Sequence, residues 1–596
     1  MWGVFLLSNS FLRQHEVFVH VETTAASVKR GAAVTTSGQA AFSRREQLVN
    51  HISRNTGRVA TFEPDFWRLD GSFMLPPPNT DGTVETGFVS AQLSNAAGNF
   101  AAVPEITVNF ATPQSLPCVA MTFDTASGEV LDAARFRAFS TAGQVVLDET
   151  ISGNRALQMS TTGGAVNAAR VTINLIRTAQ PFRRARVVEL HFGPVLEFDN
   201  SDIVSVTNIR QTESSGKALP VNKLSMRILN KSRFDLLDNT SDAAKLTESL
   251  PMTHTHSIKQ GNRQTWTNCG KFYLDSWTVR DNHVKMLGYG GAKRLGDEIY
   301  RESAFGQHTL GAIARHIAAD AGFDVDVPPV MNQSPLFPRF LGNVSHRAAL
   351  SIVAQAACCA LFEDAAGVLR FVDTLEMPTA SSFAAILDFE TQFAPPEVDL
   401  RVDFNGVLLR EFFVSLEAGR PMLAAVDAAG ITDVLIPFDR PIYSGGTAVA
   451  SAGFALTNVR FHAMYMTATV HGTGRCEITI SGNRAFFAAT DTFHAAPWFS
   501  GESEQKPYVA DLPLFLTNVS RITEIRNWYL RRTFALLANR VVCKANWRQD
   551  PTVGVGDAAV LQVHRDGRAV SGRVVAQEMD FDRGVLRGRT VLETRD

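Results

Sequence analysis

Two histidines near the middle of the chain are the first residues whose spacing could support chemistry. His254 and His256 lie two positions apart in Thr253-His-Thr-His, so in a β-strand both side chains would lie on the same face. Imidazole nitrogens are ligands for zinc, but the sequence suggests no third ligand nearby. We therefore interpret the pair as part of an exposed polar strand face, with a metal site as the alternative.

Three aspartates and a glycine-rich segment could bind ions. Asp320, Asp324 and Asp326 surround Gly322 and could chelate a hard cation, but the acid that a calcium loop carries at its twelfth position is missing. A helix end followed by a strand start explains their spacing. The segment Gly288-Tyr-Gly-Gly-Ala-Lys-Arg could face a phosphate. It lacks the strand-to-helix spacing of a phosphate-binding loop, so we interpret it as a turn.

Aromatic and basic clusters could bind sugars or acidic groups. The pairs Phe66-Trp67 and Trp498-Phe499 could stack against sugar rings, or they could fill the core at strand ends. Arg183, Arg184 and Arg186 form a short basic cluster. We interpret this cluster as a solvated or subunit-facing strand edge, with binding of an acidic ligand as the alternative.

The chain has no residue pattern typical of an enzyme. The motifs G-x-S-x-G, G-K-[ST] and H-E-x-x-H are absent. A glycan hydrolase would need two carboxylates, and acidic residues are as common as expected by chance in a chain of this length; examples are Asp124, Glu129, Glu363, Asp364, Asp580 and Asp582. We assign no catalytic, metal-binding or cofactor-binding residue, expect no cofactor, and predict that the chain is not an enzyme.

The composition indicates a globular protein of several domains. The 596 residues suggest about four domains at roughly 150 residues each. Charged residues make up 19% of the chain, against about 25% in ordinary soluble domains. A net charge of −2 gives no overall basic field for nucleic acid. Only 11 of the 57 basic residues are lysine; this bias towards arginine is typical of subunit interfaces and also of a GC-rich genome.

The cysteines and the apolar segments exclude two further classes. Six scattered cysteines without a C-x-x-C pair exclude a disulfide scaffold and a cysteine zinc site. No run reaches the roughly 18 apolar residues of a membrane-spanning helix, and the apolar start of the chain lacks the basic segment of a signal peptide. The sequence predicts a reduced, soluble chain made in the cytosol.

Period-two alternation predicts a mainly β protein. Turn residues interrupt this alternation every 8 to 12 residues or so, which is typical of short antiparallel strands. About seven or eight strands are expected between Gly87 and Gly193, which fits a β-sandwich. Strands are also expected from Asp202 to about Tyr289, and again from Pro395-Pro396 to about residue 515. The prolines of Met74-Leu-Pro-Pro-Pro mark an earlier boundary.

Helices are expected only in the second half of the chain. One follows His308, with Leu310, Ile313, Ala314 and Ile317 on one face, and closes at Gly322. Ser345 caps a second helix, which ends near Leu361 and leads into a hairpin. A third helix is expected from Asn518 to Ala538.

Several segments resemble the tail-tip proteins of tailed phages and prophages. Arg58-Val-Ala-Thr-Phe-Glu-Pro-Asp-Phe-Trp resembles their opening, and Gln180-Pro-Phe-Arg-Arg-Ala-Arg resembles the end of an inserted carbohydrate-binding-like sandwich. The later chain is similar to baseplate hub proteins of phages and contractile injection machines. The segments that carry this similarity are Leu219-Pro-Val-Asn-Lys-Leu-Ser-Met-Arg-Ile-Leu-Asn, Gly270-Lys-Phe-Tyr-Leu-Asp-Ser-Trp, Leu341-Gly-Asn-Val-Ser-His, Trp547-Arg-Gln-Asp-Pro and Met579-Asp-Phe-Asp-Arg-Gly.

The resemblance implies a mainly β, multi-domain (α+β) fold with tube-forming, β-barrel-like hub domains, a small α/β domain and a β-sandwich. The expected divisions are an N-terminal β segment (1–75), the carbohydrate-binding-like sandwich (76–197), a hub β domain (198–300), the α/β domain (301–394), a second hub β domain (395–517), and a C-terminal helix with closing strands (518–596).

The resemblance also implies a function and partners. It implies a structural virion component, a hub that forms a ring, usually a homotrimer, between the tail tube and the distal tip. The implied partners are other copies of the chain, tail-tube or distal ring proteins, tip spike or fibre proteins, and a host-surface glycan; neither a nucleic-acid site nor a membrane span is expected. The implied location is the virion tail, assembled in the host cytoplasm.

Two other functions stay open from the sequence. The first is a receptor-binding protein or adhesin in which the sandwich binds a glycan, although no glycan-binding residue can be chosen. The second is a glycan hydrolase that acts through two carboxylates.

Overall fold

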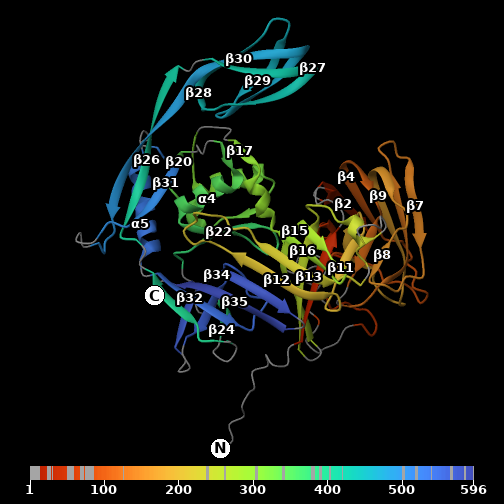
Figure 1. Cartoon of the computed structure of the whole chain (residues 1–596). Coiled ribbons are helices and arrows are strands. Elements are labelled where there is room, and N and C mark those ends of the chain that lie inside the picture. Colours follow the sequence, from red (N-terminus) through yellow and green to blue (C-terminus); the bar gives the residue numbers. More distant parts are fainter. Residues whose placement is uncertain are drawn as a thin grey trace, which may run out of the picture.

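The computed structural model places most of the chain in β-sheets (Figure 1). It describes residues 14–22, 28–29, 31–49, 59–66, 73, 75, 86–124, 127–231, 233–235, 241–260, 263–301, 306–338, 343–376, 383–387, 392, 394–401, 404–418, 421–499, 504–516, 521–538, 540–563, 568–582 and 585–594. The predicted boundary at Met74-Leu-Pro-Pro-Pro lies almost wholly outside these residues. The mainly β, multi-domain fold is confirmed.

The largest sheet has 13 strands and combines the start, the middle and the end of the chain. Its main path runs β11(Val195–Phe198), β1(Gln14–Glu22), β14(Pro251–Gln260), β15(Arg263–Val279), β16(His283–Tyr289), β13(Lys223–Leu229), β12(Ile203–Gln211), β34(Ala569–Asp582), β35(Val585–Thr594), β32(Arg540–Trp547) and β25(Glu397–Arg401). Two more strands, β33(Ala558–Gln562) and β24(Phe383–Leu387), continue from β34. Antiparallel pairing of β12 with β34, with Val206 opposite Phe581, joins residues nearly 400 positions apart.

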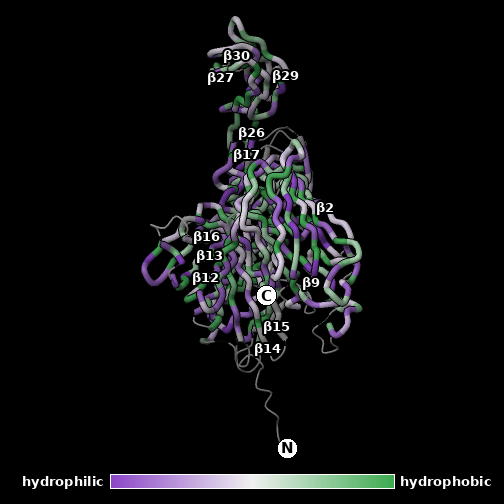
Figure 2. Tube along the Cα trace, turned by 90° about the vertical axis from the view of Figure 1, so that its right-hand side faces the viewer, coloured by the Kyte–Doolittle hydropathy of each residue, from purple (hydrophilic) through white to green (hydrophobic). Residues whose placement is uncertain are grey.

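Two smaller sheets form the sandwich. One contains β2(Ala32–Ser37), β4(Glu105–Leu116), β9(Ala165–Thr178), β6(Leu131–Phe139) and β7(Val145–Ile151). The other contains β3(Phe88–Val89), β10(Arg186–His191), β5(Ala120–Phe123) and β8(Gln158–Ser160). Their facing apolar side chains share one core, in which Val108 and Phe136 from the first sheet join Phe123 and Leu190 from the second. Figure 2 shows the alternation of hydrophilic and hydrophobic residues along these strands.

A small α/β region lies between the large sheet and the upper part of the molecule (Figure 1). Its helices are α2(Leu310–Asp320), α3(Pro329–Asn332) and α4(His346–Ala357). Its strands form three short sheets, which are β19(Val325–Asp326) with β23(Leu369–Asp373) and β22(Cys359–Glu363), β17(Ile299–Arg301) with β21(Asn343–Ser345), and β18(Gln307–His308) with β20(Phe337–Pro338). Short 3₁₀ helices occur at η2(Arg45–Val49), η3(Asp242–Lys245) and η4(Gly291–Gly296).

A six-stranded sheet projects from the body (Figure 1). It contains β26(Gly406–Ala418), β27(Met422–Pro437), β28(Ile442–Ala450), β29(Ala455–Phe461), β30(Tyr465–Ala495) and β31(Pro507–Leu516). The long strand β30 pairs with β26 near the body and with β27 farther out. Residues 421–483, the outer part, are here named the arm. At its root, helix α5(Ile522–Leu537) packs against β26 and β31 in the core shared with α2 and α4.

Local signals predicted the helices well. Thr309 and Ser345 accept hydrogen bonds from Ala312 N and Ala348 N at the starts of α2 and α4, and Gly322 has the positive φ of +70° expected beyond a helix end. The predicted end of α4 near Leu361 is wrong. The helix ends at Ala357, because Cys358 adopts a left-handed conformation and β22 begins at Cys359.

The six predicted divisions of the chain remain predictions, and the pairing of strands crosses several of them. From the predicted N-terminal segment, β1 joins the 13-stranded sheet while β2 joins the sandwich. The closing strands β34 and β35 lie in the same sheet as the predicted first hub domain. Among the described residues, no helix is both long enough and apolar enough to cross a membrane.

Candidate functional site

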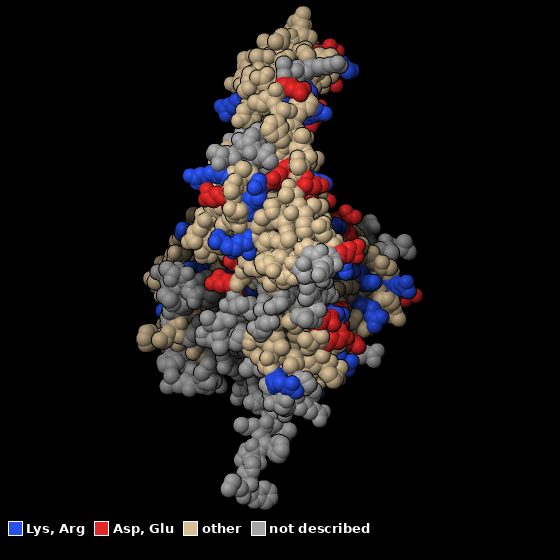
Figure 3. Space-filling view, turned by 90° about the vertical axis from the view of Figure 1, so that its left-hand side faces the viewer, with Lys and Arg blue, Asp and Glu red and all other residues tan. Residues whose placement is uncertain are grey.

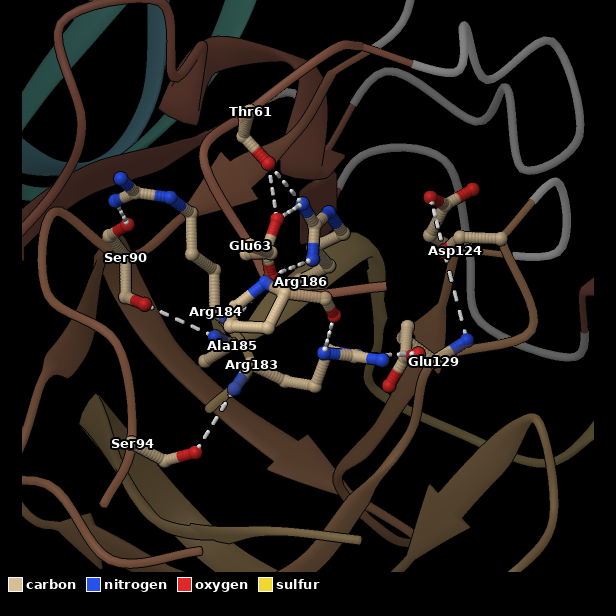
Figure 4. Close-up of polar contacts among 12 residues, drawn as sticks. Thr61, Glu63, Ser90, Ser94, Asp124, Glu129, Arg183, Arg184, Ala185 and Arg186 are labelled. Carbon is tan, nitrogen blue, oxygen red and sulfur yellow. Dashed lines mark hydrogen bonds and ion pairs between the residues drawn. The ribbon is translucent and has the colours of Figure 1, made fainter. Parts of the chain in front are cut away.

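The arginine cluster lies at one end of the sandwich, where each guanidinium has its own partner (Figure 4). Arg186 is buried and donates to Glu63 Oε1 at 2.8 Å. Arg183 donates to Glu129 Oε1 at 3.0 Å and to the carbonyl of Pro64 at 2.7 Å. Arg184 donates to the carbonyl of Ser90 at 2.7 Å. The interpretation as a solvated or subunit-facing edge is therefore wrong for Arg186, whose charge is neutralised inside the fold.

Arg186 also keeps its partner Glu63 ionised. Burial would raise the pKa of Glu63, but the hydrogen bond from Arg186 and its positive charge outweigh the effect of burial and hold that pKa below its ordinary value. The ring of Phe66 covers the guanidinium of Arg186, with its centroid 4.4 Å from Cζ. Phe66 thus stacks on a residue of its own chain. Trp67 lies outside the described residues.

The two histidines of β14 do not form a metal site with each other. Both are buried, so the prediction of an exposed polar face is wrong. His254 Nδ1 lies 2.9 Å from Asn208 Nδ2, and His256 Nε2 lies 3.0 Å from His15 Nδ1. Burial lowers the pKa of His254 to about 3, with the charge of Arg210 acting in the same direction. These histidines are neutral polar groups inside the 13-stranded sheet.

The aspartates around Gly322 bind separate partners of the chain. Asp320 ends α2 and lies 2.9 Å from His346 Nε2, whereas Asp326 in β19 accepts from Arg370 at 2.9 Å. Asp324 accepts from Leu369 N through its backbone carbonyl. The interpretation as a helix end followed by a strand start is confirmed.

The glycine-rich segment binds a carboxylate of the chain itself. After β16 ends at Tyr289, Gly291 N and Ala292 N at the start of η4 donate to Glu363 at 2.9 and 3.0 Å. The segment forms a short 3₁₀ helix rather than the predicted turn. Burial raises the pKa of Glu363 to about 7, although these two N–H groups act against it. Glu363 borders a groove of about 750 Å³ between the 13-stranded sheet and the α/β region.

The other acidic candidates are mostly engaged within the fold. Asp124 accepts from Ser127 at 2.6 Å, Asp364 accepts from Arg370 at 2.6 Å, and Asp580 accepts from Thr207 at 2.6 Å. Asp580 and Asp582 border a polar groove of about 840 Å³ on the open face of the 13-stranded sheet. Basic side chains line this groove as well as carboxylates, among them Arg227 and Lys285.

The remaining aromatic pair packs on its own chain. Trp498 makes an edge contact with Phe534 of α5, with ring centroids 6.2 Å apart, and Phe499 makes one with Phe493 at 6.1 Å. Trp498 is still 40% exposed. This agrees better with plugs at strand ends than with a sugar-binding platform.

Comparison with known proteins gave matches to solved structures alone. No family model matches the chain, and no curated protein is detectably similar in sequence. The chain is similar to the tail protein from Neisseria meningitidis MC58, with 9% identity over 67% of this chain and 94% of that one, at a TM-score of 0.37. It is also similar to the 43 kDa tail protein of prophage MuSo2 from Shewanella oneidensis, with 12% identity over 67% and 95%, at 0.34.

Both of these solved structures are named as tail proteins, the second one from a prophage. A third match, the family 32 carbohydrate-binding module of C. perfringens NanJ in complex with galactose, has 11% identity and covers 30% of this chain and 99% of the module, at a TM-score of 0.18. All three TM-scores are below 0.5.

Two groups of residues with functional potential were not predicted from the sequence. Six large apolar side chains of the arm are at least 37% exposed, namely Leu423, Ile431, Leu435, Tyr443, Val449 and Val459. A buried group of His20, Glu22, Lys29, Glu189 and His191 lies between the sandwich and the 13-stranded sheet. Period-two alternation in 421–483 could have indicated the arm, whereas no local pattern marks the buried group.

Proposed function

We propose that the chain is a structural component of a phage-type tail tip, a hub that packs against further copies of itself and against other tail proteins. The observation that carries this proposal is the arm, which leaves the body as a thin sheet (Figure 1). Its own core is small, with Ile436, Met466, Val470 and Ile478 among its buried residues. An extension of this kind exposes apolar surface that a neighbouring subunit would cover.

The exposed apolar residues support an assembly role. Ile431 is 74% exposed, Leu423 70% and Val449 65%. Single exposed apolar residues are common, but several on one projection indicate an interaction surface. In the face seen in Figure 3, most of the surface of the arm is uncharged, with several charged side chains among it. This matches the central part of protein interfaces, where charged residues are depleted.

The finer parts of the proposal come from the sequence resemblance. It implies a ring, usually of three copies, that joins the tail tube to the distal tip in the virion tail. Closed rotational symmetry would also protect outer strands such as β11 and β25, each of which has one partner in the sheet as described. We propose no catalytic role, since most of the acidic candidates named above bind donors of the chain itself.

The oligomeric state of the full-length protein tests the hub function. Mass photometry with negative-stain averages should give a ring, of three copies as the resemblance implies. The double variant Leu423→Asp with Ile431→Asp should shift the protein towards the monomer. Val166→Asp is the matched control, because Val166 is 67% exposed but lies on the sandwich. A monomeric wild-type protein at micromolar concentration, or equal dissociation by the control, would contradict the proposal.

One observation favours glycan binding as a second function of the same chain. Phe182, in the loop between β9 and β10, is 44% exposed and has a φ of +57°. A positive φ is rare for a bulky residue, and the backbone strain persists only where the surrounding structure stabilises it. The exposed ring offers a flat face of the kind on which sugars stack. Host attachment through the sandwich would follow from such a site.

A glycan array with the full-length protein tests this second function. Wild-type protein should retain a defined set of glycans, and Phe182→Ala should lose them. Val103→Ala serves as a control, since Val103 is similarly exposed on the sandwich, at 45%. Absence of binding by wild-type protein, or binding that Phe182→Ala retains, would contradict a glycan site at Phe182 and leave the hub proposal standing.

A further inference from the structure

A buried group of titratable side chains joins the sandwich to the 13-stranded sheet. His20 and Glu22 lie at the end of β1 in the large sheet, and Glu189 and His191 lie in β10 of the sandwich. Lys29 enters the group from the connection between β1 and β2. All five residues are at most 7% exposed. Burial of a charged group costs free energy unless the group is paired with an opposite charge, hydrogen-bonded or bound to a metal ion.

The geometry within the group is that of a ligand set. His20, Glu22 and His191 each offer one ligand atom, and these atoms all lie within 4.8 Å of one another. Nδ1 of His191 lies 3.5 Å from Glu22 Oε1. Two ligands of a tetrahedral zinc ion, with bonds of about 2.1 Å, are separated by about 3.4 Å. A charge-assisted hydrogen bond would be shorter, at about 2.7 to 2.9 Å.

The histidine rings are positioned for binding a cation. Among the described residues, Nδ1 of His191 and Nδ1 of His20 are buried and have no hydrogen-bond partner. The other nitrogen of His191, Nε2, lies 2.9 Å from the hydroxyl of Thr122. A partner on one ring nitrogen orients the other towards a metal.

The charges of the group also point to a cation. Lys29 Nζ lies 3.0 Å from Glu22 Oε2 and 2.5 Å from Glu189 Oε1, so one ammonium faces two buried carboxylates. Glu197 lies 3.7 Å from His20 Nδ1 and adds a third carboxylate at the edge of the group. Carboxylates thus lie next to both imidazoles, and negative charge beside a ligand set favours a bound cation.

We propose that His20, Glu22 and His191 bind one Zn²⁺ ion at the junction between the sandwich and the 13-stranded sheet. Two imidazoles with one carboxylate form a donor set suited to zinc, whereas Ca²⁺ and Mg²⁺ prefer oxygen ligands alone. Glu22 would bind the ion through Oε1 and keep its Oε2 contact with Lys29. The side chain of Glu197 is 41% exposed and gives the site an edge towards solvent. Because β1 and β10 belong to different sheets, the ion would fasten the sandwich to the body.

Metal binding by the full-length protein tests this proposal. Protein treated with a chelator and dialysed should take up one Co²⁺ per chain with the visible absorption of a tetrahedral site, and Zn²⁺ should displace it. Calorimetry should show a rise in the unfolding temperature with Zn²⁺ but not with Mg²⁺. His191→Gln and His20→Gln should abolish Co²⁺ absorption, whereas His256→Gln, a control for loss of another buried histidine, should retain it.

A milder variant tests the site even if substitution of a ligand prevents folding. Thr122→Val keeps all three ligands and removes only the partner of His191 Nε2, so it should weaken zinc binding by about 10- to 100-fold. Wild-type protein that shows neither Co²⁺ absorption nor a shift in unfolding temperature would overturn the proposal. Binding that persists unchanged in folded His191→Gln and Thr122→Val would place the metal elsewhere and overturn it too.

Discussion

Arg186 and Glu63, which are 123 positions apart in the sequence, form a buried ion pair with Nη1 and Oε1 2.8 Å apart. The pair attaches the segment around Glu63 to β10 of the sandwich. We expect Glu63→Gln to destabilise the sandwich by about 3 kcal/mol, because it leaves the guanidinium buried without its counter-charge. Calorimetric unfolding of the full chain measures this. Asp148→Asn breaks the exposed pair with Arg135 and should change the transition little; equal effects of the two substitutions would contradict the role of burial.

The same pair predicts a dependence of stability on pH. The pKa of Glu63 is lower in the folded chain than its ordinary value, so the unfolded chain binds the proton more tightly. The contribution of the pair is therefore fully present above about pH 4.5 and is lost as the pH falls through the folded pKa. Unfolding temperatures measured from pH 6 to pH 3 should fall more steeply for wild-type protein than for Glu63→Gln. Parallel profiles would contradict this prediction.

Glu363 should give a pH dependence of stability opposite in sign to that of Glu63. Its pKa is raised to about 7 by burial, so between about pH 4.5 and 7 the folded chain holds a proton that the unfolded chain has released. Stability from this group is present at low pH and falls as the pH rises through this range, by on the order of 3 kcal/mol. Glu363→Gln should flatten the profile between pH 5 and 7.5, which calorimetry would detect. An unchanged slope in the variant would show that Glu363 does not titrate there.

Two glycines with positive φ allow the cost of backbone strain to be compared with the cost of a steric clash. At Gly216, φ is +74° and a Cβ would lie 2.5 Å from the carbonyl carbon of Ala354 in α4. At Gly453, φ is +92° and no atom lies within 4 Å of such a Cβ. Gly453→Ala should cost about 1 kcal/mol through strain alone, and Gly216→Ala should cost more, about 2 to 4 kcal/mol, because backbone atoms have to move. Thermal unfolding of the two variants tests this order, and equal losses would contradict it.

Local signals in the sequence predicted elements, but not the contacts between distant segments. The cap at Ser345 and the hairpin after α4 could be predicted because they depend on residues a few positions apart. The ion pair of Lys29 with Glu189 spans 160 positions, so no spacing rule marks it. His254 and His256 were misjudged for the same reason. Their burial depends on His15 and Asn208, which β1 and β12 bring into contact with β14.

The root of the arm is held by a paired contact between a helix and a strand. Arg526 of α5 donates through Nε and Nη2 to the two oxygens of Glu411 in β26, at 2.6 and 3.1 Å. Glu411 is buried, so removal of the guanidinium leaves a carboxylate without its counter-charge. Arg526→Ala should therefore destabilise this region by about 2 to 3 kcal/mol, whereas Arg526→Lys keeps the charge but loses the two-point geometry and should cost about 1 kcal/mol.

Limited proteolysis of the full-length protein measures this effect at the arm itself. Because β26 leads directly into β27, loosening its contact with α5 should expose the connection to cleavage. Cleavage should be fastest in Arg526→Ala, intermediate in Arg526→Lys and slowest in wild-type protein. Arg521→Ala is the control, since Arg521 precedes α5 and its contact with Glu524 is exposed. If Arg526→Ala were cleaved no faster than Arg521→Ala, the arm would be held by the apolar packing of α5 on β31, and the ion pair would be dispensable.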